Sequence, residues 1–216
     1  MAQMLHKFHN VAQNTDEWMA LKCGKLGSSS AAIVMANYGK AFGDPAKKLA
    51  VEIAVQQITG KNTGQSYTNH HMERGHEQEP LAVMLYEQTF FCSVDNGGFF
   101  DCGFTGCSPD GLIGQDGSVE IKSVIPSVHF ANIKRMGVDP AYKWQCSKNI
   151  KETGRDWLDF VSFCQDFPDG KQLFTYRIYA KDLSEDFKML DVRIAQFEKL
   201  VIETKEIILE TNYINY

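Results

Sequence analysis

The sequence predicts a mixed α/β (α+β) fold in which a mixed central β-sheet is flanked by helices. Two segments rich in aromatic and β-branched residues, 157–163 and 173–179, and a hairpin pattern over 112–121 predict the strands. Helical patterns occupy the chain before and after them. The 216 residues are 44% hydrophobic and contain no Pro-, Gly- or Ser-rich linker, so we expect a single domain over residues 1–216.

Two short helices are expected near the amino terminus. Asn14 is the expected N-cap of a helix that carries Trp18, because Glu17 lies three residues after it and completes a capping box. A serine from 28–30 would cap a second helix over 31–37. Free backbone N–H groups at that helix start are suited to a bound phosphate, and capping alone is the structural alternative.

Two longer helices and a strand region follow. An Asp-Pro pair at 44–45 is expected to open a helix that ends at Gly60. Another helix is expected to run on from Pro80, which would kink it beside Glu79. Residues 99–107 are expected to form a strand or a turn.

The last third of the chain is expected to contain helix, strand, strand and helix in that order. Asp139 followed by Pro140 would start a helix that carries Gln145. A Pro-Asp-Gly turn at 168–170 would join the two strands named above. From residue 183 onward, apolar residues at helical spacing predict a long amphipathic helix that packs on the sheet or on a subunit neighbour.

The hairpin brings acidic and basic side chains together. Asp110 precedes its first strand and Glu120 lies in its second, so the two carboxylates would face each other across neighbouring strands. Side chains alternate along a strand, so Glu120 and Lys122 would point to one face while Val119 and Ile121 point into a core. A Pro-Asp-Gly turn followed by a surface Glu-x-Lys is also a common structural pattern.

The same residues are suited to phosphodiester hydrolysis. Asp110, Glu120 and the backbone carbonyl of Ile121 would form a hard oxygen site of the kind that Mg²⁺ or Mn²⁺ accepts. Glu79, from the acidic helix upstream, is the candidate additional carboxylate. A bound cation lowers the pKa of its water and polarises a phosphoryl oxygen. Lys122 is placed to hold or help deprotonate the attacking water.

Four motifs follow one another along the chain. They are a Trp-led segment at 18–29, the helix start at 75–80, the Ser-Pro-Asp-Gly and Glu-Ile-Lys pair at 108–111 and 120–122, and Tyr-Lys-Trp-Gln at 142–145. In this order they resemble the lambda exonuclease family, also called YqaJ-like viral recombinases, of the PD-(D/E)xK nuclease superfamily. The resemblance implies a restriction-endonuclease-like core.

The resemblance also implies an activity. Its members digest one strand of linear double-stranded DNA from 5′ to 3′ with Mg²⁺, for which Mn²⁺ would substitute, and leave a 3′ overhang for recombination by a single-strand annealing protein. A homotrimeric ring threaded by DNA, in the cytoplasm of a bacterial or phage-infected host cell, is implied as well. Asp110, Glu120, the Ile121 carbonyl and Glu79 would hold metal, and Lys122 would act on the water.

A site for DNA and its terminal 5′ phosphate is implied too, with Lys22, Lys25, Ser28, Ser29 and Gln145 as candidates. Lys22 stands where the family has an arginine. This replacement keeps the charge but loses the bidentate fork, so Lys25 would share the work. The aromatic residue that the family often has one turn after Gln145 is absent.

Two other classes of function stay open. A PD-(D/E)xK endonuclease of the restriction or repair type would share the metal site and would cut closed circular DNA. A non-catalytic module that binds DNA ends would have an eroded site, whereas Glu79, Asp110, Glu120 and Lys122 are all present.

The net charge of −5 opposes DNA binding unless the charges are unevenly distributed. Groups of lysines and arginines lie before the last helix, at 22 and 25, 47 and 48, 134 and 135, and 143, 148 and 151. Acidic residues crowd the last helix. We therefore expect a basic channel in an acidic shell, with solvated helix faces as the structural alternative.

Cysteine usage and hydropathy exclude several classes. The six cysteines include no Cys-x-x-Cys, and the closest pair is Cys102 and Cys107, so we expect reduced thiols without structural zinc or an iron-sulfur cluster. A zinc site at His70, His71 and His76 lacks a cysteine partner. There is no run of eighteen apolar residues and no signal-peptide pattern, so we expect no membrane association.

Overall fold

The computed structural model describes residues 6–62 and 70–211, with backbone alone for 70–76. The helices in these ranges are α1 (Asp16–Lys22), α2 (Ala31–Met35), α3 (Asp44–Thr59), α4 (His70–Phe90), α5 (Pro126–Arg135), α6 (Lys143–Thr153) and α7 (Ser184–Glu210), with the 3₁₀ turns η1 (Ser28–Ser30), η2 (Pro140–Tyr142) and η3 (Ala180–Asp182). The strands are β1 (Lys7–His9), β2 (Leu26–Gly27), β3 (Asp95–Asn96), β4 (Phe99–Cys102), β5 (Thr105–Cys107), β6 (Gly111–Ile113), β7 (Gly117–Ser123), β8 (Trp157–Phe163) and β9 (Leu173–Tyr179).

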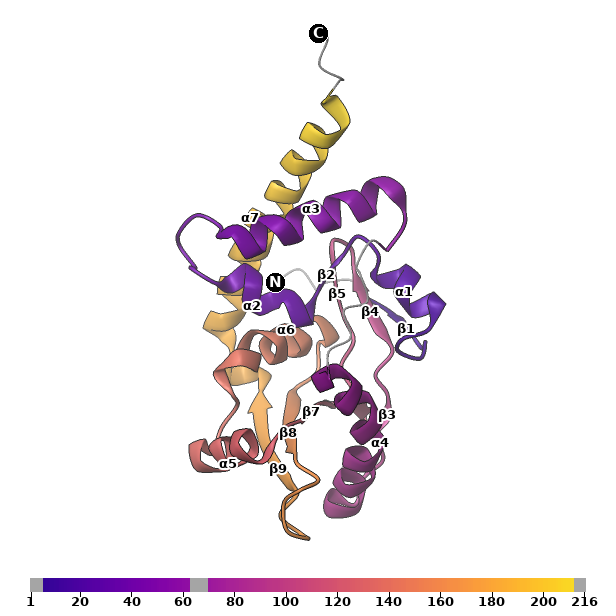
Figure 1. The fold of residues 1–216 in the computed structure, drawn as a ribbon, viewed down its shortest axis with the longest axis vertical. Helices are drawn as coiled ribbons and strands as arrows, with labels where there is room; N and C mark the ends of the chain where they lie inside the picture. The colour runs from indigo at the N-terminus through magenta and orange to yellow at the C-terminus, as the bar shows by residue number, and fades with distance from the viewer. Residues whose placement is uncertain (1–5, 63–69, 212–216) are drawn as a thin grey trace.

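These strands form two sheets (Figure 1). The smaller has the order β1-β4-β5-β2, and the larger has the order β3-β6-β7-β8-β9. Each contains one parallel pair, β2 with β5 and β7 with β8, among antiparallel pairs. The predicted α+β class with mixed β-structure flanked by helices is confirmed, although the strands divide between two sheets instead of forming one.

Helices cover both faces of the larger sheet. On one face, α4 buries Ala82 and Tyr86 against alternate residues of β7 and β8. On the other face, α6 buries Ile150 against Phe160 of β8. Figure 1 shows α4 on one side of this sheet and α5 on the opposite side. Strand alternation therefore gives each residue of β7 one of two environments, under α4 or beside α6.

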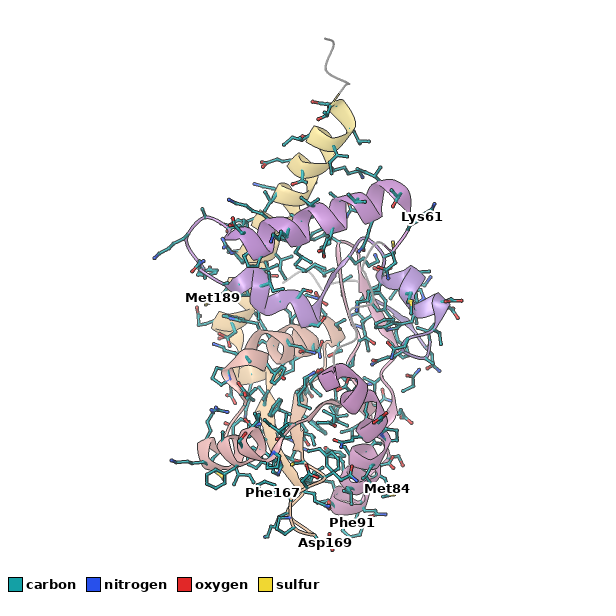
Figure 2. All side chains as sticks on the ribbon, viewed as in Figure 1. Lys61, Met84, Phe91, Phe167, Asp169 and Met189 are labelled. Carbon is teal, nitrogen blue, oxygen red and sulfur yellow. The ribbon has the colours of Figure 1, made fainter. Side chains whose placement is uncertain are left out.

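The two strands expected over 157–163 and 173–179 are present with the same bounds as β8 and β9, and they pair in antiparallel register. The turn between them contains Gly170 at a positive φ of 73°, as expected of the glycine in a Pro-Asp-Gly turn. Figure 2 shows Asp169 of this turn at the end of the molecule farthest from the carboxy-terminal end of α7.

The long final helix is confirmed, and it packs on α3 and α2 instead of on a sheet. Its buried side chains include Phe197 and Arg193. The guanidinium of Arg193 donates to the carbonyl oxygens of Val34, Ala36 and Lys40, which satisfies the open end of α2. None of the helices in the described ranges is apolar over a length that could cross a bilayer.

Several local predictions are wrong. Thr15, not Asn14, is the N-cap of α1, because the Thr15 hydroxyl accepts the N–H of Trp18 while Asn14 has a positive φ of 63°. The second helix spans 31–35 instead of 31–37, and it follows the 3₁₀ turn η1 without a side-chain cap. The fourth helix begins at residue 70, well before Pro80, which lies inside it.

Other elements are refined or new. Residues 99–107 form the antiparallel strands β4 and β5. The helix expected over 44–60 is α3, with Gly60 as its left-handed C-cap. The helix α5 and the short strands β1, β2 and β3 were not predicted. Two or three residues of sheet carry no readable period.

Candidate active site

The β6-β7 hairpin fixes Asp110. Its backbone N–H donates to the carbonyl of Val119 at 3.1 Å, one step before Gly111 pairs with Val119 in the sheet register. Its carboxylate Oδ2 accepts the N–H of Ile121 at 2.6 Å. A side chain at position 111 would lie 2.1 Å from Val94 Cγ1, so only glycine fits there. Asp110 is thereby held just before the start of β6, opposite Glu120.

Alternate side chains of β7 point to opposite faces, one in the core and one toward the cleft, as predicted. Val119 and Ile121 pack in the core under α4. Glu120 and Lys122 face the other way, and the ammonium of Lys122 lies 2.5 Å from Glu120 Oε1. The ring of Tyr142, at the end of η2, lies 5.0 Å from the same ammonium. The hairpin interpretation of the sequence is confirmed.

Helix α6 supplies two amides to the carboxylate of Glu120. The amide Nε2 of Gln145 donates to Oε1 at 2.5 Å, and the amide Nδ2 of Asn149 donates to Oε2 at 2.7 Å. The two residues are four apart and so share one face of the helix. Gln145, predicted to bind DNA, lines the cleft and contacts Glu120. Asn149 was missed, although its spacing from Gln145 was readable.

A single cleft of about 740 Å³ brings most of the predicted residues together. Of the predicted site residues, the cleft is lined by Lys22, Ser28, Ser29, Glu79, Asp110, Glu120, Ile121, Lys122 and Gln145. It is also lined by residues that were not among the predicted site residues, among them Gln13, Ile125, Val128 and Tyr142.

Carboxylates outnumber the cations around Asp110. Its burial, followed by the charge of Glu120, raises the pKa of Asp110 well above its usual range, and Glu79 adds to the rise while Lys122 opposes it. Burial alone would lower the pKa of Lys122, but Glu120 and Asp110 outweigh burial and raise it. The three acids share one nearby ammonium, so the site favours additional positive charge.

The donor set fits a hard divalent cation. The Val119 carbonyl and the Ile121 N–H both point toward β6, so the Ile121 carbonyl points the same way, past the start of β6 and beside Asp110. Together with carboxylate oxygens of Asp110 and Glu120 this is an all-oxygen set. Among the described residues no three His, Cys, Asp or Glu side chains surround one point, so the candidate set consists of two carboxylates and one backbone carbonyl.

The amino-terminal segment meets the hairpin at the cleft. The indole Nε1 of Trp18 donates to Ser108 Oγ at 3.0 Å, and Gln13 donates to the carbonyl of Pro109. Lys22 lies over the ring of Trp18 at 4.4 Å, and burial lowers the pKa of Lys22. Lys22 thus reaches the cleft beside η1.

Lys25 does not join this group. Its ammonium contacts Asp101 Oδ1 at 2.8 Å and the carbonyl of Gly103 at 2.6 Å, and Lys25 is not among the residues that line the cleft. The prediction that Lys25 shares the phosphate site with Lys22 therefore finds no support in the geometry.

The predicted basic channel is wrong for the lysines of α6. Each of them is paired with an acid, and the pairs are Lys148 with Glu152 at 2.6 Å, Lys143 with Asp186 at 2.9 Å and Lys151 with Asp191 at 2.8 Å. Lys148 is fully buried. Asp186 and Asp191 of α7 pair with two of these lysines, whereas Glu203, Glu206 and Glu210 of the same helix are exposed.

The six cysteines are all free thiols, as expected. The side chains of His70, His71 and His76, considered for zinc, lie outside the described residues.

Comparisons with known proteins agree with this geometry. The family model for the YqaJ-like viral recombinase domain matches residues 17–156. An alkaline exonuclease from Laribacter hongkongensis is 31% identical, with a TM-score of 0.76 over 91% of this chain and 99% of that one. Its crystal structure in complex with dAMP matches equally well.

A phage-related exonuclease from Haemophilus somnus 129PT shares the fold at 16% identity, with a TM-score of 0.64 over 90% of this chain and 99% of that one. A search of curated proteins found no match. The family match covers well over half of the chain and includes Asp110, Glu120, Lys122 and Gln145. The chain therefore belongs to the lambda exonuclease family of nucleases, the YqaJ-like viral recombinases.

Proposed function

We propose that this protein is a metal-dependent exonuclease that degrades one strand of linear double-stranded DNA from its 5′ end and leaves a 3′ overhang. The observation that carries the proposal is the convergence of Asp110, Glu120 and Lys122 in one cleft with Lys22 and Ser29. The first three are the groups that phosphodiester hydrolysis needs. An ammonium and hydroxyl groups beside them suit a terminal phosphate.

The relatives support this substrate. The Laribacter hongkongensis protein is an alkaline exonuclease that was crystallised with dAMP, a deoxynucleoside monophosphate. At 31% identity over nearly the whole chain, a deoxynucleotide is the ligand class that this cleft is best suited to hold.

Asp110, Glu120, the Ile121 carbonyl and Glu79 would hold Mg²⁺, or Mn²⁺ in its place. The bound cation supplies a water of lowered pKa and polarises the phosphoryl oxygen. Lys122 keeps its proton because its pKa is raised. We therefore assign it to donating hydrogen bonds, which orient the attacking water and offset charge that develops at phosphorus, instead of to removing a proton.

The test is digestion of three matched DNAs with Mg²⁺. They are a linear duplex with 5′ phosphates, the same duplex with 5′ hydroxyls, and a covalently closed circle. Each DNA carries an internal label, and the two linear duplexes are also prepared with an end label. We expect loss of one strand from its 5′ end, faster with the phosphate, and an intact circle. Cutting of the circle would assign the site to an endonuclease, and no cutting with Mg²⁺ or Mn²⁺ would leave a module that only binds DNA ends.

Family membership also supports a homotrimeric ring and transfer of the 3′ overhang to a single-strand annealing protein, in the cytoplasm of a bacterial or phage-infected cell. Sedimentation equilibrium of the purified protein tests the assembly, for which we expect three times the mass of the chain. A monomer at micromolar concentration would contradict it.

A further inference from the structure

Glu120 is a carboxylate buried in the middle of a sheet, with only 1% of its surface exposed. A buried charge is tolerated only when its oxygens are hydrogen-bonded. Three donors meet it: Lys122 and Gln145 both contact Oε1, and Asn149 contacts Oε2. A carboxylate oxygen has two lone pairs, so Oε1 is fully occupied and Oε2 keeps one. The hydrogen bond from Asn149 therefore determines which lone pair of Glu120 Oε2 remains available to a cation.

Asn149 differs from its neighbour Gln145 in what it reaches. Gln145 lines the cleft, whereas Asn149 is fully buried and is not among the residues that line it. Substrate would contact Gln145 but not Asn149. Any effect of Asn149 on the reaction must pass through Glu120.

The other end of the Asn149 amide is costly for stability. Its carbonyl Oδ1 is buried and has no hydrogen-bond partner in the part of the chain that the structure describes. An unpaired buried acceptor destabilises a fold, and an apolar residue of similar shape avoids that cost. By comparison, the buried Asn132 of α5 uses both ends of its amide, donating to Ser162 and accepting from Arg135. Position 149 is thus not optimised for packing.

We propose that Asn149 is a positioning residue that holds the carboxylate of Glu120 in its metal-binding orientation. The Asn149 amide donates to Oε2 of Glu120 from the side away from the cleft. The remaining lone pair of Oε2 is then directed to the cleft, where the cation would bind. This inference rests on the proposed metal-dependent nuclease function. It goes beyond it by assigning a role to a residue that touches neither substrate nor metal.

The experiment measures metal binding itself, by calorimetric titration of the DNA-free protein with MgCl₂ and with MnCl₂. The variants are Asn149→Ala, Asn149→Leu, which keeps the volume if the alanine variant fails to fold, and Asn132→Ala as the matched control on α5. Thermal unfolding of each variant is recorded alongside. For the Asn149 variants we expect Mg²⁺ affinity to fall about 10-fold, the low end for partners of metal ligands.

The control should bind Mg²⁺ like the native protein, even though it loses a buried hydrogen bond of its own. In the Asn149 variants, raising Mg²⁺ should restore the turnover number while the KM for DNA stays unchanged, a separation that a loosened fold does not produce. Native Mg²⁺ affinity in a folded Asn149→Leu protein would overturn the inference and leave the nuclease proposal standing. If the native protein itself bound neither Mg²⁺ nor Mn²⁺, the metal site and the inference would both be wrong.

Discussion

Lys122 and Glu120 form an ion pair at 2.5 Å in which only one partner is reachable from solvent. The side chain of Lys122 is 22% exposed, whereas that of Glu120 is 1% exposed. The carboxylate is enclosed by α6 and the sheet, and both side chains line the cleft. Substrate that enters therefore meets the lysine, while the acid is available from one direction.

This arrangement predicts the effect of Lys122→Ala. Loss of the ammonium should abolish cleavage and spare DNA binding, because the group serves the chemical step more than affinity. Single-turnover cleavage and fluorescence anisotropy with labelled duplex measure the two separately. Lys188→Ala, which removes an exposed lysine paired with Glu185, is the control and should be fully active. Near-normal cleavage by the Lys122 variant would refute the assigned role.

Lys22 and Lys25 form a matched pair for testing the terminal phosphate site. Lys22→Ala should lose about 10-fold or more of the preference for a 5′ phosphate over a 5′ hydroxyl, the value of a hydrogen bond to a charged group. Lys25→Ala should keep that preference, because its ammonium is occupied by Asp101. The ratio of kcat/KM on the two substrates is the measurement. Equal losses in both variants would contradict the placement of Lys25 outside the cleft.

The raised pKa of Asp110 predicts a pH dependence of metal binding. A protonated carboxyl does not ligate Mg²⁺, so the proton must leave before the cation binds. Burial and Glu120 raise this pKa, so apparent Mg²⁺ affinity should increase as pH rises through that raised pKa. Calorimetry at several pH values, in buffers of different ionisation enthalpy, also counts the protons released. In Asp110→Asn both the binding and its pH dependence should be weakened, and an unchanged slope would argue against Asp110.

His129 predicts a pH dependence of stability unrelated to the cleft. It is buried on α5, with its ring nitrogens 2.9 Å from Ser162 Oγ and 3.1 Å from the Lys171 carbonyl, and burial lowers its pKa despite that carbonyl. The unfolded chain then binds the proton more readily, so stability is complete above the ordinary histidine pKa and is lost as pH falls below it. The loss from this group is at most about 1.4 kcal/mol per pH unit.

The measurement is urea unfolding of the native protein and of His129→Gln between pH 7.5 and 5.5. The free energy of unfolding should fall with pH in both, and less steeply in the variant, which lacks the titrating ring. Parallel curves would show that other groups cause the acid sensitivity.

The side chains suited to catalysis could be predicted from the sequence more readily than the buried residues that hold them in place. Asp110, Glu120 and Lys122 lie within one hairpin, where local turn and alternation rules place side chains, and the structure has them as predicted. The strands β8 and β9 were equally local. Glu79 and Lys22 reach the same cleft from separate elements. Their placement was expected from the order of the family motifs, because local turn and alternation rules do not relate distant elements.

What could not be predicted depends on contacts between distant segments. From the sequence alone, Lys148 is a candidate for DNA binding. In the structure its ammonium is buried against carbonyls of Leu26 and Gly106, residues about 120 and 40 positions away in sequence. Nothing near it in the sequence distinguishes it from an exposed lysine. The contact of Asn149 with Glu120 also depends on how α6 packs against β7, although the spacing of Asn149 from Gln145 was readable in the sequence.

That buried lysine also determines how the cleft behaves as a whole. Lys148 joins α6 to β2, β5 and Ser28 on one wall, while Gln145 and Asn149 of the same helix hold Glu120 on the other. One helix therefore contacts both walls, and it fixes the separation between the η1 turn and the carboxylate of Glu120 in this structure. Each cut would fall at a constant distance from the chain end, so the enzyme should release products of one uniform length.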